Sequence, residues 1–184
     1  MTPCSPGSVA PVARLAKVLA RTLPVSSLAK CELCEPGKFQ DAEGQVECKP
    51  CKAGGFCVAG AAAIALCPAG THYGGSEHAT AVSDCVTCKP GMACPVGSTD
   101  ETPCSAGFYT NESAPTLAER RRCIKCAAGR YQSNQQSTGC EVCERGGYCT
   151  LGAAAVRPCA EGSYNDLLGQ TNRRTGCKPT EPGE

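Results

Sequence analysis

The chain has 184 residues and a formal net charge of +1, so charge does not direct it toward nucleic acid or an anionic membrane surface. Large apolar residues are scarce: Leu, Ile, Val and Phe together number 26, and there is no Trp. So few large side chains cannot form one shared core that offsets an ordering cost of roughly 1–2 kcal/mol per residue. No stretch is apolar over the ~18 residues that a transmembrane helix needs, so no direct membrane insertion by this segment is expected.

The first 30 residues differ in composition from the rest of the chain. They contain no acidic residue, and the stretch 9–23 places Arg14, Lys17 and Arg21 near one face of a possible helix. Basic residues interrupt the apolar run that a secretory signal needs over ~7–15 positions. We therefore interpret 1–30 as a non-repeat basic segment. It resembles a transit peptide, or it belongs to a fragment or imperfect gene model whose true leader is missing.

From Cys31 onward the cysteines follow a repeating spacing. The numbers of residues between successive cysteines are 2, 13, 2, 5, 9, 17, 2, 5, 9 and 18, and the series starts again at Cys123. A fixed period of this kind indicates a repeat protein, and the 18 cysteines indicate a cross-linked scaffold. The spacing predicts a first superrepeat at 31–122 and a second, truncated one at 123–184, in which Thr180 aligns with Cys88.

A smaller unit, Cys-x-x-Gly, recurs within the superrepeat. It occurs eight times, starting at Cys34, Cys51, Cys67, Cys88, Cys104, Cys126, Cys143 and Cys159. Glycine at a fixed turn position predicts a positive φ, which costs glycine little. Six of the eight units carry an aromatic residue five positions after the cysteine: Phe39, Phe56, Tyr109, Tyr131, Tyr148 and Tyr164. We predict that each ring packs over its own disulfide; the alternative is a stripe of rings that binds a ligand.

The units form two module types. Long modules run over 34–48, 67–85, 104–123, 126–140 and 159–177, and short ones over 51–57, 88–94 and 143–149. Their loops are rich in Gly, Ser, Thr, Asn and Gln, which favour turns and short two-stranded hairpins over long helices. The predicted fold is an elongated array of small disulfide-rich repeats, with short β-hairpins and loops, little regular secondary structure and no shared core.

The pattern CxxCxxGxY…CxxCxxGxxC resembles the ephrin receptor-like cysteine-rich repeat, which occurs in tandem in large extracellular proteins. The resemblance extends from Cys31 to the C-terminus and is best at 31–51 and 123–143. The long module is also similar to the first module of tumour necrosis factor receptor repeats, where the two cysteines that flank the loop pair with each other.

This second resemblance implies a set of disulfides, each closing one module. They are Cys34–Cys48, Cys51–Cys57, Cys67–Cys85, Cys88–Cys94, Cys104–Cys123, Cys126–Cys140, Cys143–Cys149 and Cys159–Cys177. Cys4 and Cys31 then have no assigned partner, and Cys4 is the prime candidate for a free thiol. An interleaved scheme with Cys31–Cys48 and Cys34–Cys51 stays open, because spacing alone does not fix connectivity.

Zinc binding is the main chemical alternative to disulfides. Five Cys-x2-Cys pairs occur, and two of them separated by 13 residues approach four-thiolate zinc spacing. The other cysteines recur as strictly and have no pair partner for such a site: Cys57, Cys67, Cys94, Cys104, Cys149 and Cys159. We therefore expect disulfides and no metal site.

Few other residues suggest chemistry. His72 and His78 share a Gly-rich loop and are interpreted as surface loop histidines, and the scattered acidic residues do not suggest a paired-carboxylate active site. The run Arg120–Arg122 either binds an acidic partner such as a sulfated glycan or is a solvated loop. Asn111, in Asn-Glu-Ser, is the single N-glycosylation acceptor.

These observations predict a non-enzymatic extracellular segment, acting as a spacer or protein-interaction module of a larger secreted or cell-surface protein. We expect an unidentified protein or glycan partner, no nucleic acid, no catalytic residue and no cofactor. Disulfides require an oxidising compartment, which places the chain at the cell surface or outside the cell. The alternative function is an intracellular zinc-binding adaptor that uses the Cys-x2-Cys pairs.

Overall fold

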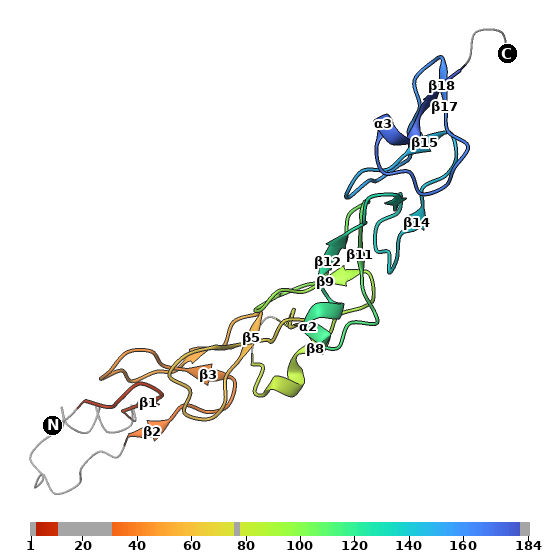
Figure 1. The fold of residues 1–184 in the computed structure, drawn as a ribbon. Helices are drawn as coiled ribbons and strands as arrows, with labels where there is room; N and C mark the ends of the chain where they lie inside the picture. Colours follow the sequence, from red (N-terminus) through yellow and green to blue (C-terminus); the bar gives the residue numbers. More distant parts are fainter. Residues whose placement is uncertain (1–2, 11–30, 76–77, 181–184) are drawn as a thin grey trace, which may run out of the picture. The chain divides into compact units, whose positions relative to one another are not determined.

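The computed structural model describes residues 3–10, 31–75 and 78–180 (Figure 1). Within them, strands of two or three residues pair as nine separate antiparallel hairpins, each formed by strands that follow one another in the chain. The helices described there span a single turn. The predicted disulfide-rich array of hairpins with little regular secondary structure is confirmed.

The chain divides into two compact units, and the first comprises residues 1–87 and 96–100. Four hairpins lie in it. They pair β1 (Ser8–Val9) with β2 (Glu32–Leu33), β3 (Lys38–Phe39) with β4 (Lys49–Pro50), β5 (Gly55–Phe56) with β6 (Ala65–Leu66), and β7 (Thr71–His72) with β8 (Val86–Thr87). A 3-10 turn, η1 (Val82–Asp84), precedes β8.

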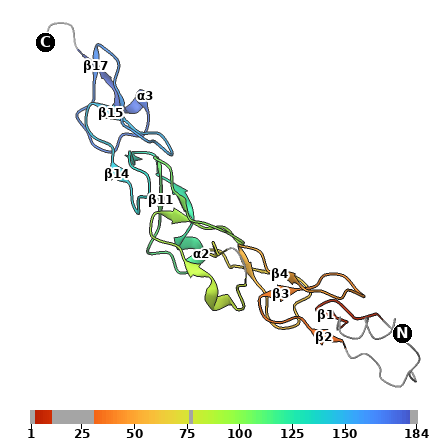
Figure 2. The same ribbon diagram turned by 180° about the vertical axis from the view of Figure 1, so that it is seen from behind.

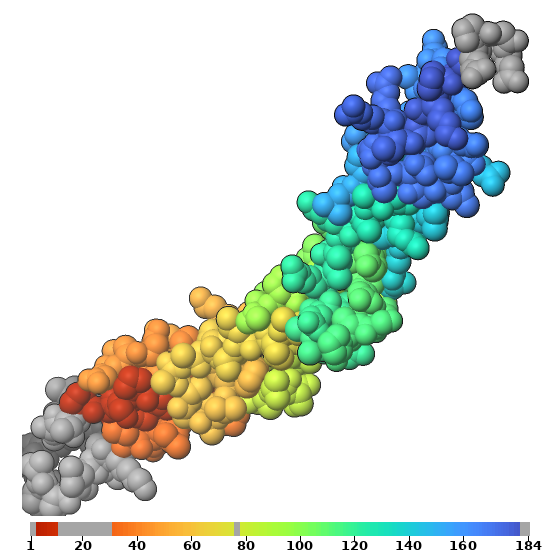
Figure 3. All heavy atoms as spheres, in the orientation of Figure 1, coloured from red at the N-terminus to blue at the C-terminus, as the bar shows by residue number. Residues whose placement is uncertain are grey.

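The second unit comprises residues 88–95 and 101–184. Its hairpins pair β9 (Met92–Ala93) with β10 (Thr102–Pro103), β11 (Phe108–Thr110) with β12 (Cys123–Lys125), β13 (Arg130–Tyr131) with β14 (Glu141–Val142), β15 (Gly147–Tyr148) with β16 (Arg157–Pro158), and β17 (Ser163–Tyr164) with β18 (Lys178–Pro179). One-turn helices α2 (Leu117–Arg120) and α3 (Arg173–Gly176) close two loops. Figure 2 shows β11, β14, β15 and β17 following one another in the second unit. The space-filling view in Figure 3 shows that neighbouring modules of this unit are in contact.

Each hairpin begins at a Cys-x-x-Gly turn. All eight predicted glycines have a positive φ, between 73° and 93°, which confirms the prediction. At Gly129 close packing also requires glycine, because an added Cβ would collide with the carbonyl oxygen of Gly169. A ninth turn runs from Cys4 to Gly7, whose φ is 84°. The sequence carries the same Cys-x-x-Gly motif here, before the predicted superrepeat, with Val9 at the position where six of the other eight turns carry an aromatic residue.

The ninth turn changes the interpretation of the N-terminus. Residues 3–10 provide strand β1, which pairs with β2, and Cys4 is bonded to Cys31. The expectation of a free thiol at Cys4 is therefore wrong, and the described part of the segment 1–30 contributes to the first hairpin. Residues 11–30, and with them most of the basic helix considered above, lie outside the described residues.

Nine disulfides use all 18 cysteines, and each begins at the cysteine of a Cys-x-x-Gly turn. The structure joins Cys34–Cys48, Cys51–Cys57, Cys67–Cys85, Cys88–Cys94, Cys104–Cys123, Cys126–Cys140, Cys143–Cys149 and Cys159–Cys177, the pairs that the resemblance implied, and adds Cys4–Cys31. Every bond closes a loop of its own module. In the chain-entropy model a disulfide that closes a loop of ~15 residues contributes about 3 kcal/mol to the stability of the fold.

Backbone hydrogen bonds join each module to the next within a unit. Three such bonds connect the 126–140 module to the module that follows it. They run from Gly129 N–H to the Cys149 carbonyl (2.8 Å), from Gln132 N–H to the Ala153 carbonyl (3.1 Å) and from Gly152 N–H to the Cys126 carbonyl (2.8 Å). The amides of Gly37, Gln40 and Gly60 make the equivalent bonds in the first unit. Because the bonding groups belong to the backbone, they fix the register of neighbouring modules without a large apolar surface.

The apolar clusters are small and local. In one, Tyr131 packs against the Cys143–Cys149 disulfide and Ala153; in the other, Phe39 packs against Cys51–Cys57 and Ala61. Each ring thus packs on the disulfide of the following short module. The prediction that it packs on the disulfide of its own loop is wrong for both rings.

The packing of Tyr131 predicts where its removal acts. Tyr131→Ala should speed amide exchange around 143–153 and leave 34–57 unchanged, since the ring packs on the next module and 34–57 belongs to the other compact unit. Full burial of such a ring is worth ~1.5–3 kcal/mol, and this ring is only half-buried, so a loss of about 1 kcal/mol is expected. Tyr131→Phe should be nearly silent, because the carboxylates that accept from its hydroxyl, Glu141 and Glu144 (3.3 Å), are both exposed. Faster exchange confined to 126–140 would contradict the assignment.

Candidate interaction site

A buried polar side chain stands six positions after the turn cysteine in four long modules. These residues are Gln40, Thr110, Gln132 and Asn165. Gln132 donates from Nε2 to the Gly139 carbonyl (2.9 Å) and accepts from the Asn134 amide (3.0 Å), so its amide group bridges the loop. In the short modules the same position holds the second cysteine of the disulfide. In the sequence these residues can be recognised by their fixed position six residues after the turn cysteine. The spacing of the cysteines alone does not reveal them.

Removal of this bridge should loosen its own loop. Gln132→Ala leaves the Gly139 carbonyl and the Asn134 amide without their partner, at a cost of about 1–3 kcal/mol. The matched control is Gln135→Ala, at an exposed position of the same loop, which should cost less than ~0.5 kcal/mol. Native-state hydrogen exchange over 132–140 measures both. Equal effects of the two variants would show that the bridge is unimportant.

The three consecutive arginines have different environments. Arg121 is only 9% exposed, and its Nη1 donates to both carboxylate oxygens of Glu112, at 2.9 and 2.8 Å. Its Nε donates to the Cys88 carbonyl. Burial raises the pKa of Glu112, but hydrogen bonds from Arg121 and Thr110 outweigh it, so the pKa lies below its ordinary value. Arg121 is therefore a structural residue, and the interpretation of the whole run as a solvated or docking loop is wrong for it.

Arg122, by contrast, is exposed and lines a depression of about 690 Å³ beside the β11–β12 hairpin. The depression is also lined by Lys125, Phe108, Ile124 and Asn111. Asn111 is half-buried and accepts the Ser113 amide on its side-chain oxygen (3.1 Å). The structure thus brings the predicted glycosylation acceptor and one of the predicted docking arginines to the same depression.

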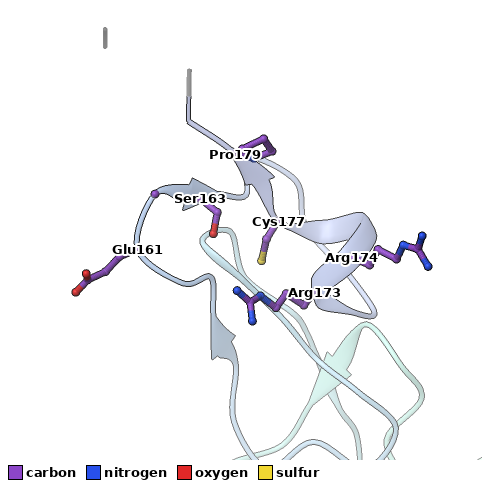
Figure 4. A pocket seen from close by; sticks show the side chains of 7 residues that line it. Glu161, Ser163, Arg173, Arg174, Cys177 and Pro179 are labelled. Atoms are coloured by element: carbon purple, nitrogen blue, oxygen red, sulfur yellow. The ribbon is translucent and has the colours of Figure 1, made fainter. Parts of the chain in front are cut away.

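A second depression, of about 480 Å³, lies beside the β17–β18 hairpin (Figure 4). The side chains of Ser163 and Cys177 point toward the space beside Arg173, whereas those of Glu161 and Arg174 point away. Both depressions include the closing cysteine of a long loop and an arginine close before it. An exposed guanidinium group can pair with a carboxylate or a sulfate, although Glu119 also lines the first depression and Glu161 the second.

The two histidines differ from each other. His72 lies in strand β7, half-buried and paired opposite Val86, so its assignment to a loop is wrong. His78 is exposed, with a φ of 81°. No helix in the described part of the chain is long and apolar enough to cross a membrane.

The Cys-x2-Cys pairs are not built as metal sites. The two cysteines of each pair belong to different disulfides; Cys48 is bonded to Cys34, for example, and Cys51 to Cys57. With all 18 cysteines oxidised, the pairs offer no thiolate to zinc.

Comparison with known proteins agrees with this architecture. Residues 22–65 match the family model described as tyrosine-protein kinase ephrin type A/B receptor-like. The matched range includes the bonds Cys34–Cys48 and Cys51–Cys57. The comparison with curated proteins finds no match. The chain therefore carries a cysteine-rich repeat of the ephrin receptor-like type.

Proposed function

We propose that the chain is a non-enzymatic extracellular segment that acts as a spacer or protein-interaction module of a larger secreted or cell-surface protein. The observation that carries the proposal is the use of all 18 cysteines in disulfides within single modules. Such bonds persist in oxidising compartments and are rare in the cytosol. Modules that contact mainly their neighbours suit a spacer, because each added module adds length without needing a shared core.

The proposed partner is an extracellular protein or an acidic glycan. Arg122 and Lys125 line one open depression and Arg173 lines the other, which supports binding of carboxylate or sulfate groups. Retention on a heparin column should fall for Arg122→Ser combined with Lys125→Ser. Unchanged retention would contradict the acidic-glycan partner.

Asn111 is the proposed site of N-glycosylation. Asn111→Gln should lower the mass of the secreted chain by one glycan, whereas Asn134→Gln, outside any acceptor motif, should leave the mass of the glycan unchanged. A secreted chain without sugar would contradict this site and leave the spacer role unaffected.

The cellular location of the chain tests the proposal that it is an extracellular segment. Antibodies against the oxidised chain should label intact source cells or detect the protein in their medium. Labelling that appears only after permeabilisation, of a chain with reduced thiols that binds zinc, would support the intracellular adaptor instead.

A further inference from the structure

The long module 104–123 contains two aromatic residues, whereas every other module contains at most one. Tyr109 stands five positions after the turn cysteine, at the position from which Tyr131 packs on its neighbouring module. Phe108 precedes it, at a position that holds no aromatic residue in any of the other eight turns. Phe108 belongs to neither of the apolar clusters described above and is only half-buried. The packing between modules therefore does not account for this second ring.

The glycosylation acceptor follows this ring at a distance of three residues, and both line the same depression. A turn holds Asn111 in place: its Oδ1 accepts from the Ser113 amide (3.1 Å), and its carbonyl oxygen accepts from the Ala114 amide (3.1 Å). Its Nδ2, the atom to which an N-linked sugar is attached, donates no hydrogen bond within the described residues. A sugar on this nitrogen therefore begins at the wall of the depression.

The lining of the depression combines the groups that a neutral sugar uses. The face of the Phe108 ring can pack against the C–H groups of a pyranose ring. Arg122 offers hydrogen-bond donors, and Glu119 offers an acceptor, since its bonds from Thr116 use only Oε2. The hydroxyl and acetamide groups of a sugar both donate and accept. The volume of about 690 Å³ lies within the ~300–1,000 Å³ of sites that hold small ligands.

We propose that the depression holds the first N-acetylglucosamine of an N-glycan on Asn111, packed against the ring of Phe108. This inference rests on the glycosylation of Asn111 proposed above. The sugar covers a ring face that water otherwise reaches and joins the loop after β11 to the β11–β12 hairpin, so it stabilises this module. It also competes for the depression with the acidic partner proposed for Arg122 and Lys125.

Hydrogen exchange over 104–123 tests whether the sugar packs in the depression. The secreted chain is trimmed enzymatically to its first N-acetylglucosamine and compared with the same chain produced while N-glycosylation is blocked. Exchange should be about threefold slower with the sugar, because contact with an aromatic ring adds modestly to the stability of the module. Exchange over 34–48, in the other compact unit, should be the same in both forms.

Phe108→Leu separates packing on the ring from mere attachment of a sugar. The variant keeps the acceptor motif and an apolar side chain, but the sugar should no longer slow exchange over 104–123. Phe56→Leu, at a half-buried phenylalanine of the other unit, is the matched control and should keep the full effect of the sugar. Each comparison is made between the two forms of one variant, so any loss of stability caused by the substitution itself cancels.

Nuclear Overhauser contacts between protons of the sugar and the ring of Phe108 should be present in the trimmed wild-type chain. Absence of these contacts overturns the inference, and so does an effect of the sugar that is nil in the wild type or unchanged in Phe108→Leu. In these cases the sugar is still attached, and the proposed glycosylation stands. A secreted chain without sugar at Asn111 overturns both.

Discussion

Replacement of both Cys126 and Cys140 by serine should destabilise the loop 126–140 by about 3 kcal/mol, the chain-entropy contribution of a bond with a sequence separation of 14. The double change leaves no unpaired thiol to exchange with other disulfides. Exchange should also rise around Cys143–Cys149, because Tyr131, which packs there, stands on the loosened hairpin. Hydrogen exchange of the oxidised variant measures both regions.

The effect should stay within the neighbourhood of the lost bond. The module 34–48 has the same sequence separation between its cysteines, belongs to the other compact unit and should keep wild-type exchange. The reciprocal variant, with serine at Cys34 and Cys48, should loosen that module and leave 126–140 intact. Collapse of both modules in either variant would reveal a shared core and contradict the modular account.

Arg121→Ala should strongly destabilise the second unit. It leaves the Glu112 carboxylate and the Cys88 carbonyl without their charged donor. Loss of one partner of a buried ion pair costs 3–5 kcal/mol, but the Glu112 side chain is 36% exposed, so water reduces the expected loss to about 2 kcal/mol. Arg122→Ala, at the adjacent exposed position, should cost less than ~0.5 kcal/mol.

Acid should reduce the difference in stability between the wild-type chain and Arg121→Ala. The folded chain lowers the pKa of Glu112, so the ion pair stabilises the fold above the ordinary pKa of this carboxyl group and loses that effect as the pH falls through the lowered value. Hydrogen exchange near neutral pH and in acid, compared between the two proteins at each pH, measures the change. A difference that grows in acid would contradict the role assigned to Glu112.

The turns were predictable because they depend on local chemistry. Glycine three positions after a cysteine indicates a positive φ, and all eight predicted glycines adopt it. The turn at Cys4 has the same glycine at Gly7, but it lies before Cys31, where the regular cysteine spacing begins, so the spacing did not point to it. The module on which each ring packs was not predictable. The offset from the cysteine identifies the aromatic residue, but it does not show which neighbouring module covers the ring.

The roles of Gln132 and Arg121 show a second limit. A glutamine in a polar loop and the middle residue of an arginine run look like solvated side chains, and only the fold shows that both are buried and bonded. The elongated shape stays a prediction. Small-angle scattering should give a radius of gyration well above the roughly 16 Å expected for a compact chain of this length.

The connectivity of the disulfides is the central claim, and peptide mapping without reduction tests it most directly. Proteolysis of the oxidised chain, followed by mass spectrometry, should recover peptides that link Cys4 to Cys31, Cys34 to Cys48 and Cys51 to Cys57. Reduction should add about 18 Da to the intact chain, two hydrogens for each of nine disulfides. Peptides that link Cys31 to Cys48 and Cys34 to Cys51, or free thiols that hold zinc, would contradict the account.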